Sequence, residues 1–264
     1  MSQGRDNIPV GWVETTLGKE TYFVNDKILL SKVNTTNYVS TENLLSDRLG
    51  KINATTLPSI SKVNHYQKGD TLFSNIRTYF KKVWHSNDEG GSSNDVLIFR
   101  PKNTLRLDNK FLFFFISSDY FIDFTVKSAK GTKMPRGDKN AMSTFSFNLP
   151  PLQEQKAIAN VLTAFDDKIE NLRAQNDTLE QTAQTIFTEW FGKYQIGDLS
   201  ADKAGELPEG WRVGKLGEVT KICGGTTPST KNPDFWGGTI YWTSPKDLSN
   251  SKEMFLLSTE KTIT

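Results

Sequence analysis

The chain has 264 residues, 36% hydrophobic and 23% charged, which is ordinary for folded globular domains and excludes disordered and collagen-like classes. The longest apolar run, residues 111–116, is far shorter than the ~20 residues that span a bilayer, and no signal-peptide pattern follows Met1, so we predict a cytoplasmic protein. A single cysteine, Cys223, excludes an internal disulfide and a cysteine-clustered zinc site.

Positive charge is concentrated in the first part of the chain. Residues 1–150 contain 20 lysines and arginines against 14 aspartates and glutamates, a net charge of +6, whereas residues 151–195 contain four against seven. Attraction to phosphates is the sequence-independent part of DNA binding. The distribution therefore favours DNA contact by residues 1–150, with ordinary variation of surface charge as the alternative.

An internal repeat opens the chain. Pro9-Val10-Gly11-Trp12 followed by Leu17-Gly18 recurs as Pro208-Glu209-Gly210-Trp211 followed by Leu216-Gly217, an offset of 199 residues. Each copy consists of a turn and then a stretch that is expected to open a strand. The repeat predicts two units with a shared framework and different contents.

Residues 1–150 are predicted to mix strands and helices. We expect strands at residues 71–76 and 96–99, entered through turns at residues 68–70 and 90–93. Residues 108–110 are expected to cap one largely buried helix over residues 111–124, which is apolar on more than one face.

Two basic clusters are candidates for contact with DNA. The first interleaves cations with aromatic rings directly after the predicted strand, and the second falls in a loop shaped by glycine and proline. A solvated charged face is the alternative for each cluster. The predicted DNA-binding residues are Arg77, Tyr79, Lys81, Lys82, Lys130, Lys133, Arg136 and Lys139.

A heptad pattern follows the double proline at residues 150–151, which is expected to start a helix that ends near Gly192. About 40 helical residues make a rod of roughly 60 Å. Its narrow apolar seam requires a partner helix from outside this segment, unless the helix packs on its own domain. The seam consists of Ile158, Leu162, Phe165, Ile169, Leu172, Asn176, Leu179, Ala183, Ile186 and Trp190.

No pattern for catalysis is found. His65 and His85 lie in no metal-ligand spacing and are predicted to be surface or loop residues, and no phosphate-binding glycine motif occurs. Residues 232–235 lack the second proline of the Asn-Pro-Pro-aromatic loop of adenine methyltransferases. We therefore predict no catalytic residue and no metal site.

Several ordered stretches resemble the specificity subunit of type I restriction-modification systems. The residues before the heptad pattern look like that family's Pro-Pro-Leu-x-Glu-Gln entry to a spacer helix, and the resemblance covers nearly the whole chain. The matching stretches are residues 69–77, 90–97, 131–136, 149–155, 224–229, 235–242 and 244–248.

The resemblance implies a non-catalytic subunit with two target recognition domains, held apart by two long antiparallel helices. It implies double-stranded DNA as a partner, together with modification subunits that bind S-adenosylmethionine and restriction subunits that use ATP and Mg. No cofactor is expected in this chain. The implied fold is α+β, with a β-rich recognition domain (1–150), a coiled-coil spacer helix (151–195) and an incomplete second recognition domain (196–264).

The second unit is expected to be truncated. Residues 8–150 give the first unit 143 residues, whereas residues 207–264 give the second only 58. The unpaired seam then predicts an antiparallel homodimer, or pairing with a separately encoded half. The competing hypotheses are a coiled-coil scaffold without DNA readout and a stand-alone methyltransferase or nuclease.

Overall fold

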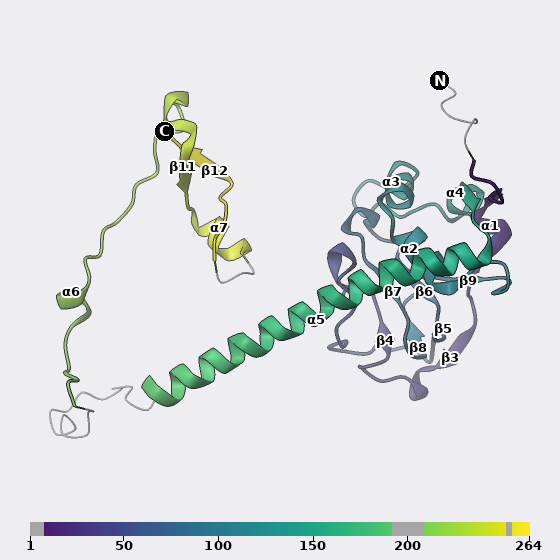
Figure 1. Cartoon of the computed structure of the whole chain (residues 1–264), viewed down its shortest axis with the longest axis horizontal. Helices are drawn as coiled ribbons and strands as arrows, with labels where there is room; N and C mark the ends of the chain where they lie inside the picture. Colours follow the sequence, from purple (N-terminus) through teal and green to yellow (C-terminus); the bar gives the residue numbers. More distant parts are fainter. Residues whose placement is uncertain (1–7, 192–208, 252–254) are drawn as a thin grey trace. The chain divides into compact units, whose positions relative to one another are not determined.

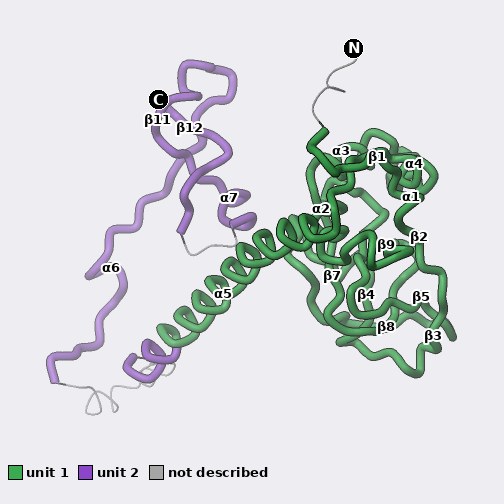
Figure 2. The backbone as a smooth tube through the Cα atoms, turned by 45° about the vertical axis from the view of Figure 1, so that its right-hand side comes forward, with its two compact units in different colours: residues 1–184 green, residues 185–264 purple. Residues whose placement is uncertain are grey.

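The computed structural model describes residues 8–191, 209–251 and 255–264, which form two compact units (Figures 1 and 2). The first unit comprises residues 1–184 and the second residues 185–264. The long helix α5 (Leu152–Phe191) begins in the first unit and ends in the second. This helix confirms the one predicted from the heptad pattern, and it ends directly before Gly192.

Two four-stranded sheets and one strand pair build the first unit. The first sheet is antiparallel, in the order β2 (Thr21–Phe23), β9 (Val96–Pro101), β6 (Thr71–Ser74), β7 (Val83–His85). The second has the order β3 (Lys27–Leu29), β5 (Lys62–Tyr66), β8 (Gly90–Ser92), β4 (Tyr38–Val39). The separate antiparallel pair is β1 (Val13–Thr16) and β10 (Ser146–Leu149).

The predicted strands are β6 and β9, which pair in the middle of the first sheet. Alternate side chains point to opposite faces of a strand. Phe73 and Phe99 join the core that contains helices α2 and α3, whereas Leu72 and Ile98 join a second core with Tyr66 of β5. The sheet is therefore buried on both faces, which explains its continuous apolar sequence.

The predicted turn at residues 90–93 is wrong, because Gly90–Ser92 forms the buried strand β8. A Cβ atom at Gly90 would lie 2.1 Å from the backbone oxygen of Asn37, and one at Gly91 would lie 2.4 Å from Val63. These glycines allow close packing of neighbouring segments rather than a change of chain direction.

The single helix predicted over residues 111–124 is two helices, α2 (Asn109–Ser117) and α3 (Asp119–Lys127). Ser118 between them has extended backbone angles, and its hydroxyl accepts a hydrogen bond from the backbone N–H of Phe121. Serine is a preferred N-cap, so it starts a new helix here instead of continuing the first. The predicted cap by Asp108 is confirmed.

Short helical turns connect these elements. In the first unit they are α1 (Leu17–Glu20), η1 (Leu30–Lys32), η2 (Ser46–Arg48), η3 (Thr78–Phe80) and α4 (Lys139–Thr144).

The second unit contains α6 (Leu216–Val219), η6 (Pro233–Phe235), β11 (Trp236–Trp242), α7 (Pro245–Asn250) and β12 (Lys261–Ile263). No described residue of the second unit is buried.

The two repeat copies share their turn but not their strand. Gly11 and Gly210 have similar positive φ angles of 86° and 82°, and each copy continues into a four-residue helix. The predicted strand forms only in the first copy, where β1 pairs with β10. Residues 211–215 have no paired strand within the described part of the chain.

Candidate nucleic-acid interface

The two basic clusters lie next to each other at the end of strand β6. The backbone N–H of Arg77 donates to the carbonyl of Pro135 at 2.9 Å, and Ile76 forms an isolated antiparallel bridge with Arg136. Gly137 donates to the carbonyl of Asn75 at 3.2 Å. Segments separated by more than fifty residues in sequence therefore form one surface, although in the sequence they are two separate clusters.

The first cluster is a strained turn. Arg77 and Lys81, which flank η3, both have left-handed backbone angles, with φ of 49° and 54°. Each such non-glycine residue costs about 1–2 kcal/mol. The buried Thr78 and the hydrogen bond from Arg77 to the second loop hold the turn in place. Tyr79 and Phe80 are consequently exposed, with ring centroids 4.8 Å apart.

A shallow cavity of about 210 Å³ opens between the two loops. Both loops contribute to its wall, as do strand β6 and the segment after β4. Its lining combines apolar and cationic side chains, the combination expected where bases and phosphates are contacted together. The lining residues are Thr41, Ser74, Ile76, Arg77, Phe80, Lys82 and Met134. Phe80 and Met134 were not among the predicted site residues.

Four predicted cations lie on the exposed surface of the loops. Arg77 and Lys133 are exposed and form no ion pair with any residue that the structure describes. Lys130 pairs with Asp138 at 2.5 Å, and Arg136 pairs with Asp95 at 3.1 Å. Both of these cations remain more than half exposed, so their charge faces solvent.

Three predicted cations are directed towards their own domain. Lys81 pairs with Asp119 at 2.8 Å, and Lys139 lies 5.8 Å from the centre of the Phe23 ring. The ammonium group of Lys82 donates to the carbonyl of Thr41 at 2.6 Å, and burial lowers the pKa of Lys82. Sequence charge alone does not distinguish these lysines from Arg77.

The prediction that both histidines are surface or loop residues is wrong. His65 lies on β5 and His85 on β7, and both are half-buried. The His85 ring lies 5.5 Å from that of Phe113, and burial is the largest cause lowering the pKa of His85. Pro233–Phe235 forms the turn η6, which the Asn232 side chain caps. Among the described residues, no group of three potential metal ligands occurs.

Helix α5 has its apolar seam open to solvent. Every residue from 164 to 191 is exposed, and Phe165 and Leu179 keep 65% and 66% of their accessible surface. Ile158 differs from the rest of the predicted seam, because it packs against the core of the first unit. The predicted partner interface therefore begins one turn later, and its pairing stays a prediction.

A family model described as the type I restriction modification DNA specificity domain matches residues 15–181. This range includes both basic loops and most of α5. The chain belongs to this family. None of the helices described in residues 8–191, 209–251 and 255–264 has the length and apolar character needed to cross a membrane.

Named relatives are specificity subunits of type I restriction enzymes. The MjaVIII subunit of Methanocaldococcus jannaschii is 32% identical over 52% of this chain and 32% of its own length. The HindI subunit of Haemophilus influenzae is 22% identical over 94% of this chain and 68% of its own length. This chain spans about a third of the length of the first two matched relatives, at 32% and 34%.

Two solved structures share the fold. An S subunit from M. genitalium matches all of this chain and 64% of its own with a TM-score of 0.56 at 14% identity. The HsdS subunit from Thermoanaerobacter tengcongensis matches 94% of this chain and 64% of its own with a TM-score of 0.50 at 22% identity. The α+β fold with a long helix is thus a specificity-subunit fold.

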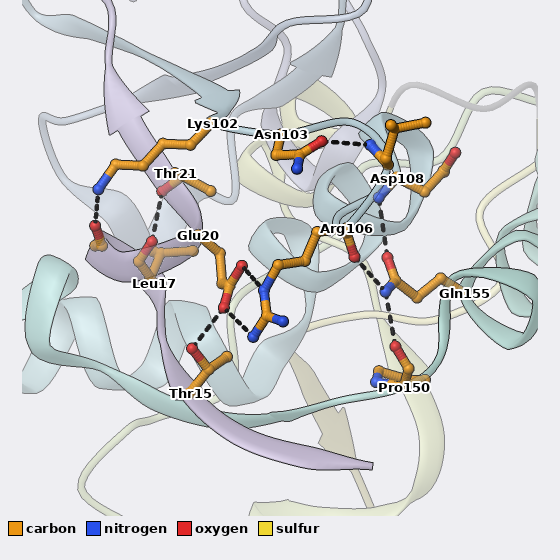
Figure 3. A network of polar contacts seen from close by, with 12 residues as sticks. Thr15, Leu17, Glu20, Thr21, Lys102, Asn103, Arg106, Asp108, Pro150 and Gln155 are labelled. Carbon is orange, nitrogen blue, oxygen red and sulfur yellow. Dashed lines mark hydrogen bonds and ion pairs between the residues drawn. The ribbon is translucent and has the colours of Figure 1, made fainter. Parts of the chain in front are cut away.

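The specificity-domain helix α5 is joined to its β-rich domain through polar contacts at its first turn (Figure 3). The buried side chain of Gln155 forms three hydrogen bonds there, and the indole N–H of Trp12 donates to Glu154 at 3.0 Å. Gln155 is the last residue of the helix-entry motif, and its burial was not predicted from the sequence. The sequence feature that could have indicated this role is the position of Gln155 four residues after Pro151, in the first turn of the predicted helix.

A buried ion pair lies beside this contact. Glu20, only 6% exposed, accepts two hydrogen bonds from Arg106 at 2.8 and 2.9 Å and one from Thr15 at 2.7 Å (Figure 3). Burial raises the pKa of Glu20, but the hydrogen bonds from Arg106 and Thr15 outweigh burial and hold that pKa below its ordinary value of 4.5.

This ion pair predicts an acid-sensitive step in stability. Because the folded pKa is lower, the unfolded chain binds the proton more tightly, so the contribution of Glu20 is complete above pH 4.5 and is lost as pH falls through the folded pKa. Thermal unfolding between about pH 5 and pH 3 should show a smaller acid-induced fall in Tm for Glu20→Gln than for the unaltered chain. Equal falls would mean that Glu20 does not titrate with unfolding.

Proposed function

We propose that this chain recognises DNA sequence for a type I restriction-modification complex and leaves methylation and cleavage to partner subunits. The observation that carries the proposal is the joining of two basic loops into one exposed surface with an aromatic pair. Cations on such a surface neutralise phosphates, and rings and loop side chains reach the bases. Family membership supports the same conclusion.

The partners follow from the family resemblance. Modification subunits would supply S-adenosylmethionine and methylate adenine, and a restriction subunit would use ATP and Mg to translocate and cut DNA. This chain would hold none of these cofactors and would act in the cytoplasm. It contributes the recognition surface and the spacer.

The exposed seam of α5 supports a two-helix spacer. A long helix is stable in water only when its apolar stripe is covered. We propose that the covering helix comes from a second copy in antiparallel orientation, or from a separately encoded half-subunit. Asn176, the one polar seam residue, is exposed and would set the register of the pair.

The decisive experiment is co-purification with a modification subunit, followed by mapping of the adenines that become methylated. A single split target sequence is the expected result. Purified complex that binds no DNA would favour a coiled-coil scaffold, and methylation by the chain alone would establish an enzyme.

Replacing Arg77 and Lys133, the two predicted cations that form no ion pair with a described residue, should weaken DNA binding without changing the sequence preference. Each lost phosphate contact lowers the slope of log affinity against log salt by about one, so Arg77→Ala with Lys133→Ala should lower it by about two. Lys62→Ala with Lys68→Ala, at two exposed positions outside the basic loops, is the control that removes the same number of charges. Affinity should be measured on the assembled complex across salt concentrations; an unchanged slope rejects this surface.

A further inference from the structure

We infer that Gln155 is a positioning residue that sets the angle at which α5 leaves the recognition domain, and hence the spacing between DNA half-sites. The inference rests on the proposed function, because spacing has meaning only if the chain reads a split site. It concerns a residue that touches no DNA surface described above. Figure 3 shows its contacts.

The side-chain amide of Gln155 is buried, and both its oxygen and its nitrogen form hydrogen bonds. Its exposed fraction is 0%, and its Oε1 accepts from the backbone N–H of Asp108 at 2.9 Å. Its Nε2 donates to the carbonyls of Arg106 and Pro150, at 2.9 and 2.7 Å. One side chain thus joins the first turn of α5 to the loop that leads into α2 and to the segment that leaves β10.

The groups that Gln155 contacts are themselves held in place. The Arg106 guanidinium is paired with buried Glu20, and Glu20 also accepts from Thr15 on β1. The Asp108 side chain caps α2 by accepting from two backbone N–H groups. The helix is therefore attached to a frame that includes β1, α1 and α2, not to a single loop.

The other contacts that fix α5 in the first unit are few: Ala159 and Ile158 pack against the core, and Trp12 donates to Glu154. Gln155 and Ala159 are its only buried residues. Further along, a groove of about 410 Å³ lies between the helix and the domain, with Trp84, His85 and Phe113 on one wall and Asp166, Glu170 and Arg173 on the other. Contacts across an open groove constrain the helix less than packed ones.

A small change at this attachment has a large effect at the far end. A rotation of about 10° displaces the end of a roughly 60 Å helix by about 10 Å. Successive base pairs are about 3.4 Å apart, so this displacement equals about three base pairs. Directional hydrogen bonds restrict rotation more tightly than an apolar contact of the same size.

Two variants test the inference in the complex with modification subunits. Gln155→Met keeps the volume but removes all three hydrogen bonds, and Gln155→Glu keeps an acceptor for Asp108 but loses both donors. Synthetic duplexes should carry the mapped half-sites at the natural separation and at separations one and two base pairs shorter and longer. We expect discrimination between these separations to fall by about fivefold, equivalent to ~1 kcal/mol, with unchanged base preference within each half-site.

Gln153→Met, at an exposed position of the same helix turn, is the matched control and should keep the natural spacing profile. Thermal unfolding shows whether each variant folds. If Gln155→Met does not fold, Gln155→Glu provides the test. A folded variant with the unaltered spacing profile overturns the inference. A uniform loss of affinity at all separations also overturns it, because that indicates a purely structural role. If the unaltered complex reads no split site, the proposed function itself fails.

Discussion

A chain carrying Leu172→Lys and Leu179→Lys should stay monomeric at concentrations where the unaltered chain forms dimers. Both side chains lie on the α5 seam and are 46% and 66% exposed in the single chain, so lysine there leaves the recognition domain folded. Burying a leucine side chain stabilises by about 1.5–3 kcal/mol. A two-fold dimer buries four of them, about 6–12 kcal/mol at full burial, which is comparable with the ~8 kcal/mol of a micromolar association.

Sedimentation of the purified chains at micromolar concentration measures this effect. Ala174→Lys with Gln181→Lys is the matched control, because the two positions have the same spacing and lie away from the seam on the helical wheel. The control should dimerise like the unaltered chain. If seam and control variants behave alike, the helices do not pair through this seam.

A stable monomer of the unaltered chain at micromolar concentration would contradict self-association. The partner would then be a separately encoded helix, and the seam variants should block its capture instead. In both cases the same leucines are required. The experiment therefore separates the identity of the partner from the location of the interface.

The features predicted correctly from sequence are local ones. The spacing of Ile169, Leu172 and Leu179 predicts the helix because helical periodicity depends only on neighbouring residues. Strands β6 and β9 were recognised because both faces of their sheet are buried and their sequences are continuously apolar. The Asp108 cap was predicted for the same reason, since a cap acts on the next few residues.

The features missed depend on contacts between distant segments. Gly90 and Gly91 look like a turn until Asn37 and Val63 pack where a Cβ atom would lie. The direction of Lys82 depends on the Thr41 carbonyl, forty-one residues away in sequence. Likewise, the joining of the two basic loops depends on the Arg77–Pro135 hydrogen bond, which leaves no mark in either segment.

The second large effect is expected at Asp70, where Asp70→Ala should destabilise the recognition domain by about 3–5 kcal/mol. Asp70 is 2% exposed and accepts from Nε and Nη2 of Arg100, both at 2.7 Å, and from the backbone N–H of Gln67 at 2.7 Å. The hydrogen bond to Asp70 is the largest cause raising the pKa of Arg100. Without Asp70 the guanidinium still stays charged, because arginine is not deprotonated in proteins at neutral pH.

Most of this loss reflects a guanidinium whose remaining ion pair is the longer one to exposed Asp26, at 3.8 Å, and not the net strength of the Asp70–Arg100 pair. Replacing both partners by apolar side chains of similar size is often nearly neutral. The double variant Asp70→Leu with Arg100→Met should therefore recover much of the free energy of unfolding that Asp70→Ala loses. Denaturant unfolding of the unaltered chain, Asp70→Leu, Arg100→Met and the double variant measures the coupling. A double variant as unstable as Asp70→Ala would show that shape, not charge pairing, is required here.

The same substitution also separates folding from recognition. Asp70 lies directly before β6, and β6 leads into the strained turn at Arg77, so the ion pair fixes the strand that carries the turn. Asp70 itself contributes no group to the basic surface. Below the unfolding transition of Asp70→Ala, the slope of log affinity against log salt should equal that of the unaltered complex. The double variant at Arg77 and Lys133 should instead keep its stability and show a smaller slope. A lowered slope in folded Asp70→Ala would mean that the pair also sets the geometry of the turn.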